Sequence, residues 1–210
     1  MPRFLRDVWY MAGWSSELGN APLSRRLFDR QIALFRDRQG QPQAIADRCV
    51  HRFAPLSRGE VDGDLLVCPY HGLSYDGTGQ CRRNPFSEHI PKTAKVEAWK
   101  VVERHGALWL WGGDAEQADP AKIPDFSMVD DGPGTRVVRG YTLLEAPYEF
   151  GIDNLMDLSH IEFVHKGSFA GAGVIFAGKH EVTERDGAIW SNWWMPGVRA
   201  PAHTQGIYAP

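Results

Sequence analysis

Residues 49–51 read Cys49-Val-His51, and residues 68–71 read Cys68-Pro-Tyr-His71. Sixteen residues separate His51 from Cys68, so the two segments lie in different loops. Each loop offers one thiolate and one imidazole, the two softest common metal ligands in proteins. The pattern predicts that the loops face each other and hold one metal centre.

The chain around these loops predicts a small all-β unit extending from about Arg25 to Trp111. Short apolar runs rich in β-forming residues alternate with turn signals. The runs are Gln31–Phe35, Gln43–Ala46, Asp64–Cys68 and Ala107–Trp111, and the turns are Gln39-Gly40, Asp62-Gly63 and Asp76-Gly77. Both ligand pairs therefore belong at strand ends or turns.

Two kinds of metal centre use two cysteines and two histidines. Structural zinc usually draws a Cys-x2–4-Cys pair from one knuckle, whereas each loop here is mixed. A Rieske-type [2Fe–2S] cluster takes two cysteines on one iron and two histidines on the other. We therefore expect Cys49, His51, Cys68 and His71 to bind such a cluster, with zinc as the alternative. The third cysteine, Cys81, is expected to be a small packed residue.

Length and charge restrict the function classes. The chain has 210 residues, with 23 Lys+Arg against 26 Asp+Glu, which gives a formal net charge of -3. This length fits two domains, predicted at residues 1–115 and 116–210, with an acidic, proline-bearing linker near residues 114–125. The balance of charge predicts no nucleic-acid partner. No signal peptide and no apolar run of about 20 residues is found, so no membrane partner and a cytoplasmic location are expected.

The second unit is marked by a helical pattern over Glu149–Val164, which follows Pro147. Its apolar residues cover nearly the whole circumference, so the helix is expected to be buried on all sides. The same helix carries four polar residues, Asn154, Asp157, His160 and His165. Unpartnered burial costs about 1–3 kcal/mol for each such group. A metal ion between the two histidines would provide partners.

The i, i+5 spacing of His160 and His165 places them about 140° apart on a regular helix. They can converge only if the helix contains a π-bulge or ends before His165. The alternative is one packed core histidine and one exposed histidine at the helix end.

After the helix, the runs Lys179–Thr183 and Ala188–Trp194 flank Arg185-Asp186-Gly187 and predict a β-hairpin. One helix and two or three strands do not bury both faces of a sheet, so a truncated domain is expected. The predicted fold class is α+β: a small all-β domain, then the start of a helix-plus-antiparallel-sheet catalytic domain. Trp190, Trp193, Trp194 and Phe176 are interpreted as core residues, with an aromatic pocket as the alternative.

From Trp9-Tyr10 to His165, the chain resembles the Rieske non-haem iron oxygenases. The motifs Cys49-Val-His51, 68–77 and Gly79-Gln-Cys81 resemble those of Rieske proteins. The motifs 154–160 and Val164-His165 are most similar to the vanillate and dicamba O-demethylase subgroup. The chain departs from the respiratory-complex type, whose extra cysteines close a disulfide, because Tyr70 occupies one such place.

The resemblance implies that His160 and His165 are two arms of a 2-His-1-carboxylate triad on mononuclear Fe(II). It implies that Asp157 bridges toward a Rieske histidine of a neighbouring subunit in a homotrimer, and that Asn154 stands near the iron. The family's third ligand is a carboxylate far downstream. Asp186, Glu181 and Glu184 do not suit that role, so we expect the third ligand to lie outside this chain.

The resemblance also implies the partners and the reaction. An NAD(P)H-dependent reductase with flavin and a [2Fe–2S] centre would supply electrons, and O2 would oxidise a small aromatic substrate, such as a methoxylated aromatic acid, by hydroxylation or O-demethylation. The rival interpretation is an electron carrier of the Rieske ferredoxin type, without its own catalytic iron. That rival accounts for the chain only to about Gly113 and leaves the polar helix unexplained.

Overall fold

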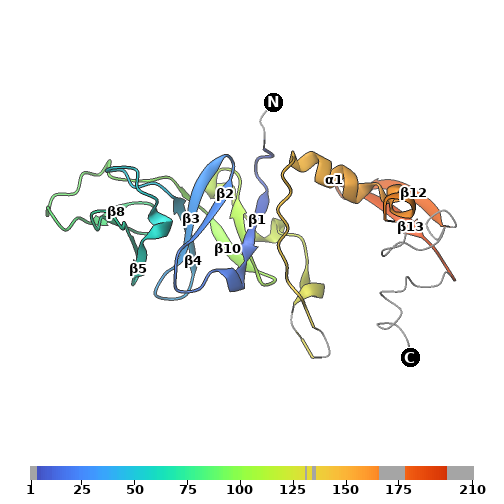
Figure 1. Cartoon of the computed structure of the whole chain (residues 1–210), viewed down its shortest axis with the longest axis horizontal. Coiled ribbons are helices and arrows are strands. Elements are labelled where there is room, and N and C mark those ends of the chain that lie inside the picture. The colour runs from blue at the N-terminus through green and yellow to red at the C-terminus, as the bar shows by residue number, and fades with distance from the viewer. Residues whose placement is uncertain (1–3, 131, 134–135, 166–177, 198–210) are drawn as a thin grey trace. The chain divides into compact units, whose positions relative to one another are not determined.

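The computed structural model describes residues 4–130, 132–133, 136–165 and 178–197. The chain forms two compact units, Met1–Arg139 and Gly140–Pro210 (Figure 1). The first unit is all-β and the second combines short helices with a hairpin, which confirms the predicted α+β class. The predicted boundary between residues 115 and 116 stays a prediction.

Three antiparallel sheets make up the first unit. Their orders are β1(Trp9–Trp14)-β11(Ala107–Trp111)-β10(Val101–Arg104), β2(Leu23–Leu27)-β3(Arg30–Arg36)-β4(Pro42–Ala46)-β9(Ala98–Trp99), and β5(Glu60–Asp62)-β6(Leu65–Val67)-β7(Ser74–Tyr75)-β8(Cys81–Arg83). The four strands expected from the sequence are thus present as β3, β4, β6 and β11. Gly40 and Gly63 both have positive φ in their turns, which the predicted hairpins require.

The core of the first unit connects the β2–β3–β4–β9 sheet to the β5–β8 sheet. Fully buried Phe35 and Ile45 pack in one cluster with Leu66 and Tyr75, and the three cysteine side chains belong to the same cluster. The β5–β8 sheet lies at one end of this unit, at the left of Figure 1. The cysteine loops are therefore anchored in a packed interior.

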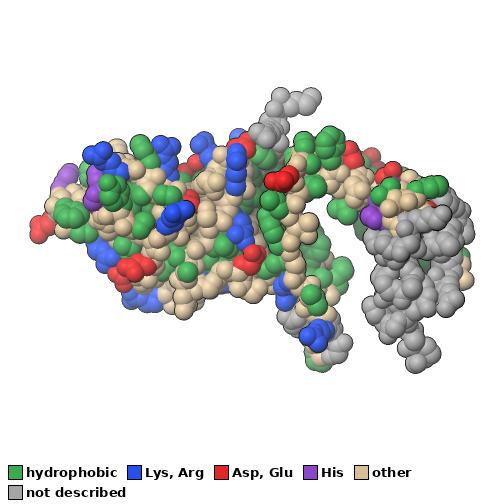
Figure 2. Space-filling model, viewed as in Figure 1, with side chains coloured by type: hydrophobic (Ala, Val, Ile, Leu, Met, Phe, Trp, Pro, Cys, Tyr) green, Lys and Arg blue, Asp and Glu red, His purple; other side chains and the backbone are tan. Residues whose placement is uncertain are grey.

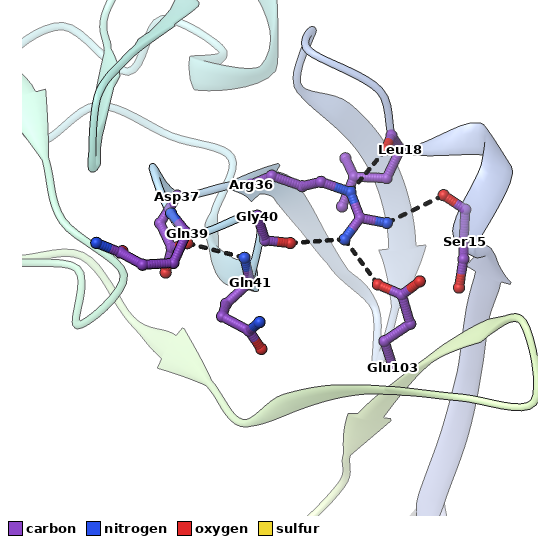
Figure 3. A network of polar contacts seen from close by, with 8 residues as sticks. All are labelled: Ser15, Leu18, Arg36, Asp37, Gln39, Gly40, Gln41 and Glu103. Atoms are coloured by element: carbon purple, nitrogen blue, oxygen red, sulfur yellow. Dashed lines mark hydrogen bonds and ion pairs between the residues drawn. The ribbon is translucent and has the colours of Figure 1, made fainter.

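Arg36, at the end of β3, fastens the β2–β3–β4–β9 sheet to the β1–β11–β10 sheet (Figure 3). Its guanidinium donates to the carbonyls of Leu18 at 2.9 Å and Ser15 at 3.2 Å and to the Glu103 carboxylate at 2.6 Å. The bond from Arg36 lowers the pKa of Glu103. These contacts join two of the sheets of the first unit.

The segment predicted to be a linker is packed against the first unit. It forms 3₁₀ turns at Ala115–Gln117, Pro120–Lys122 and Ser127–Val129. The Trp9 indole donates to the Asp119 carbonyl at 2.8 Å, and Phe126 stacks on Trp109 with ring centroids 5.8 Å apart. The acidic, proline-bearing composition fits these turns, because Asp119 accepts from the Ala121 amide as a cap.

The second unit contains α1(Tyr148–Met156), a 3₁₀ turn at Leu158–His160, α2(Ile161–Val164) and the hairpin β12(Lys179–Arg185)-β13(Ala188–Trp194). Asp186 and Gly187 have positive φ, which confirms the predicted tight turn. The expected continuous helix is wrong, because the chain leaves the helical path at Asp157.

The expected burial of this helix on all sides is also wrong for the described residues. Leu155 is 74% exposed and Val164 is 72% exposed. The hairpin tryptophans interpreted as core do not form one either: Trp194 is 70% exposed, while Trp193 stacks on His180 with centroids 4.2 Å apart. Phe176 lies outside the described residues. A two-stranded hairpin offers too little apolar surface to cover such side chains.

Among the described residues, no helix is long and apolar enough to cross a membrane.

Candidate functional site

The two Cys/His loops of the first unit have the same backbone closure. In the first loop, the Cys49 amide donates to the Ala54 carbonyl at 2.9 Å and the Phe53 amide donates to the Cys49 carbonyl at 3.0 Å. In the second loop, the Cys68 amide donates to the Leu73 carbonyl at 2.8 Å and the Gly72 amide donates to the Cys68 carbonyl at 3.0 Å. The two loops therefore have equivalent backbone conformations around their candidate ligands.

The fourth residue after each cysteine adopts a left-handed conformation. Gly72 has φ 73°, and a Cβ there would meet Pro85 Cγ at 3.0 Å. Phe53 has φ 59°, an uncommon conformation for a bulky residue, and its ring lies under the Arg48 guanidinium at 3.9 Å. Strain of this kind is concentrated at functional sites.

The cysteine candidates are buried more deeply than the histidine candidates. Cys49 and Cys68 are each 2% exposed, and their thiols lie within hydrogen-bond reach of each other. His51 is exposed and His71 is half-buried, and their imidazoles lie edge to face with centroids 4.7 Å apart. Histidine side chains also mark this end of the unit on the surface (Figure 2). The structure therefore places the two cysteines next to each other and the two histidines next to each other.

The arrangement suits a cluster with an inner, thiolate-held iron and an outer, imidazole-held iron. Within the described residues, no three His, Cys, Asp or Glu side chains form one group; the four candidates lie as a cysteine pair and a histidine pair. Ligands that are paired two by two fit two irons better than one tetrahedral zinc ion.

The thiols receive hydrogen bonds from their own surroundings. Burial raises the pKa of the Cys68 thiol, and the amides of Tyr70 and His71 oppose that effect by donating to its sulfur. The buried Tyr75 hydroxyl lies 3.2 Å from Cys49 Sγ. Burial, followed by the bond to Cys49, raises the pKa of Tyr75, so the hydroxyl keeps its proton.

Cys81 is 3% exposed and packs in the same core, where burial raises the pKa of its thiol. Its sulfur lies 3.5 Å from the Arg83 carbonyl. The prediction that it is a small packed residue is confirmed.

In the second unit, Asp157 ends α1 and begins the turn that carries His160. Its carboxylate accepts from the Ser159 amide at 2.9 Å and from the Ser159 hydroxyl. These bonds lower the pKa of Asp157. An Asp-x-Ser cap of this kind competes with the continuing helix and breaks it.

The break brings the two histidines together. His160 and His165, at the two ends of α2, lie edge to face with centroids 5.4 Å apart. His160 Nδ1 bonds the Asp157 carbonyl, and because a carbonyl only accepts, this nitrogen carries the proton and leaves Nε2 free to act as a ligand. Of the two conditions stated from the sequence, the structure shows the second: α2 ends at Val164, before His165, and a 3₁₀ turn at Leu158–His160 precedes it.

The carboxylates that the sequence analysis set aside all lie in the hairpin. Glu181 and Glu184 are exposed on β12, and Asp186 occupies the hairpin turn. Glu162 on α2 is 9% exposed. Asn154 is exposed on α1. No described carboxylate forms a three-residue ligand group with the two histidines.

Two residues near the first site escaped the sequence analysis as functional residues. Tyr75, in the short strand β7, reaches Cys49 in the other loop. Asp47 follows β4 and is 8% exposed. An aspartate directly after a buried strand and two positions before a ligand cysteine is the signal that could have identified it.

Comparison with known proteins agrees with this two-site arrangement. Residues 8–97 match the model of the Rieske [2Fe-2S] domain, and residues 144–208 match that of the vanillate O-demethylase oxygenase C-terminal domain. The dicamba O-demethylase oxygenase component of Stenotrophomonas maltophilia is 42% identical over 195 residues, 92% of this chain and 57% of that protein. The vanillate O-demethylase oxygenase subunit of Pseudomonas sp. is 34% identical over 198 residues, 94% of this chain and 55% of that protein.

Solved structures give the same result. The crystal structure of dicamba monooxygenase bound to dicamba superposes with a TM-score of 0.89 at 40% identity, over 97% of this chain and 61% of that one. Dicamba monooxygenase with non-haem iron and dicamba gives a TM-score of 0.76 at 40% identity, over 90% of this chain and 53% of that one. The chain thus spans little more than half the length of these relatives.

Proposed function

The chain belongs to the Rieske non-haem iron oxygenase family, and from that premise we propose that it is part of the terminal oxygenase component of a multi-component monooxygenase. The proposed substrate is a small aromatic compound, such as a methoxylated aromatic acid, which is hydroxylated or O-demethylated with O2. The observation that supports this most is the presence of two converging ligand groups in one chain: the Cys/His loops and the His160/His165 pair.

In this proposal, Cys49, His51, Cys68 and His71 hold the [2Fe–2S] cluster, and His160 and His165 hold mononuclear Fe(II) with a carboxylate from outside the 210 residues. When bound, the cluster would supply one-electron transfer, and the iron would supply O2 chemistry for hydroxylation of a methyl or methoxy carbon; a hydroxylated methoxy group breaks down to a phenol and formaldehyde.

The protein side chains have defined tasks around these groups. The Tyr70 and His71 amides and the Tyr75 hydroxyl donate to the cysteine sulfurs and offset their negative charge. The Asp157 carbonyl fixes the proton of His160 on Nδ1, which orients Nε2 outward. The Asp157 carboxylate is proposed to link the site to a cluster histidine of the next subunit in a homotrimer, with Asn154 nearby.

The partners follow from the electron supply. An NAD(P)H-dependent reductase with flavin and a [2Fe–2S] centre is proposed to reduce the cluster. The proposed location is the cytoplasm, where such a reductase finds its reduced nicotinamide. Exposed His51 is accessible to a partner protein, which suits electron entry or exit.

The test uses the full-length protein with such a reductase, NADH and dicamba as the probe substrate. We expect formaldehyde to form with NADH and O2 consumption, and His160→Ala to abolish formaldehyde while the cluster is still reduced. Unchanged formaldehyde formation in His160→Ala would contradict the assigned iron site. Reduction of the cluster without O2 consumption on any methoxylated aromatic acid would favour the electron-carrier alternative.

A further inference from the structure

We infer that Asp47 is a positioning residue, whose buried carboxylate holds the loop of Cys49 and His51 in the geometry that binds the cluster. The inference rests on the ligand set proposed above and adds a residue outside that set.

The Asp47 carboxylate is 8% exposed and is surrounded by hydrogen-bond donors. Its Oδ1 accepts from the Ser57 amide at 2.6 Å. Its Oδ2 accepts from the Ser57 hydroxyl at 2.6 Å and the Ser24 hydroxyl at 2.8 Å. The Asp47 amide donates to the Gln31 carbonyl at 2.9 Å. The carboxylate thus connects β2 to the residue after the ligand loop, and the backbone amide of Asp47 bonds to β3.

The two ligand loops share the same backbone closure but differ in how their flanking segments are joined. The second loop connects β6 to β7, which pair with each other through Leu66↔Tyr75 and Val67↔Ser74. The first loop begins after β4 and leads into the 3₁₀ turn Leu56–Arg58, so no strand pair joins its two ends. The hydrogen bonds between Asp47, before the first loop, and Ser57, after it, take the place of the β6–β7 strand pairing that joins the two ends of the second loop.

The chemistry of the contact also favours a positioning role. A buried carboxylate is costly, and the carboxylate of Asp47 accepts hydrogen bonds from neutral hydroxyl and amide groups. Hydrogen bonds to an ionised acceptor are short and directional, so they fix Ser57 relative to Asp47 more firmly than apolar packing would. Partners of metal ligands that act through orientation commonly change metal affinity 10- to 100-fold when removed.

The experiment compares three variants of this chain. Asp47→Ala removes the carboxylate and its hydrogen bonds to Ser24 and Ser57. Asp47→Asn keeps its shape, because an amide oxygen accepts from the Ser57 amide and an amide nitrogen donates to hydroxyls that can turn to accept. Asp37→Ala is the matched control: the Asp37 carboxylate accepts from the amides of Gln39 and Gln41 at 3.0 and 2.8 Å, in the turn between β3 and β4 (Figure 3).

For each variant we measure the iron and acid-labile sulfide content, the electron paramagnetic resonance spectrum of the reduced protein, the rate of cluster loss to a chelator and the melting temperature. We expect Asp47→Ala to lose the cluster about 10-fold faster and to broaden or shift the spectrum. Asp47→Asn should restore both readouts. Asp37→Ala should melt at a lower temperature but keep the spectrum and the rate of loss.

The inference is overturned if Asp47→Ala retains the spectrum and the rate of the unsubstituted chain, or if Asp37→Ala changes them equally. If Asp47→Ala does not fold, Ser57→Ala carries the test: faster cluster loss supports the inference, and an unchanged rate overturns it. A lack of cluster in the unsubstituted chain would instead contradict the proposed ligand set itself, and the inference with it.

Discussion

The hydroxyl of Tyr75 lies 3.2 Å from the sulfur of Cys49, and both side chains are buried. The Val50 amide donates to the same Tyr75 oxygen at 3.3 Å. Once the cysteine is an iron-bound thiolate, only the tyrosine can donate.

Replacing Tyr75 with phenylalanine is expected to lower the reduction potential of the cluster. The lost bond stabilises the more negative, reduced state; a net value of about 0.5–1.5 kcal/mol corresponds to roughly 20–65 mV for a one-electron couple. Redox titration followed by visible spectroscopy measures the shift. Tyr70→Phe is the control, because Tyr70 is 63% exposed. Equal potentials in Tyr75→Phe and the unsubstituted protein would refute the role of this bond.

Replacing Gly72 with alanine is expected to destabilise the second ligand loop. The left-handed backbone costs an alanine about 1–2 kcal/mol, and its Cβ would also press on Pro85. Gly40→Ala is the matched control, because Gly40 has φ 77° and open space around it. Thermal unfolding should show the larger loss for Gly72→Ala, and only this variant should lose iron. Similar losses in both variants would show that the approach of Pro85 has no effect.

Asp157 caps the turn that carries His160 and is also the proposed bridge to the neighbouring subunit. Two substitutions distinguish these two roles. Asp157→Asn keeps an oxygen for the Ser159 amide, so in the full-length protein it should leave both metals bound while single-turnover product formation is lost. Asp157→Ala should also loosen the mononuclear iron, because the turn before His160 loses its cap. Near-normal turnover in Asp157→Asn would show that the carboxylate is only a cap.

Short runs bounded by turn residues were sufficient to predict β11 and the tight turn at Asp186-Gly187, because turn chemistry is local. The burial of α1 was not predictable, because a hydrophobic pattern reports a preference and not the presence of a covering layer. Predicting the break at Asp157 would have required weighing the Asp-x-Ser cap against the helical periodicity of the same residues. Asp47 was missed because its partners, Ser24 and Ser57, are distant in sequence and meet only in the fold.

The chain of 210 residues is expected to retain mononuclear iron poorly. The part of the chain that the structure describes brings His160 and His165 together but adds no carboxylate to them. Two neutral imidazoles leave the charge of Fe(II) uncompensated and complete only part of a facial triad. Iron analysis before and after desalting measures this. A third iron that survives desalting would show that a carboxylate of this chain, such as Glu162 or Glu181, completes the site.

The central claim is that Cys49, His51, Cys68 and His71 bind a [2Fe–2S] cluster, and electron paramagnetic resonance of the dithionite-reduced chain, combined with iron and acid-labile sulfide analysis, tests it most directly. The claim predicts two irons and two sulfides per chain after desalting and the low average g-value of a histidine-ligated cluster. Stoichiometric zinc with no acid-labile sulfide, in protein produced with ample iron, would contradict it.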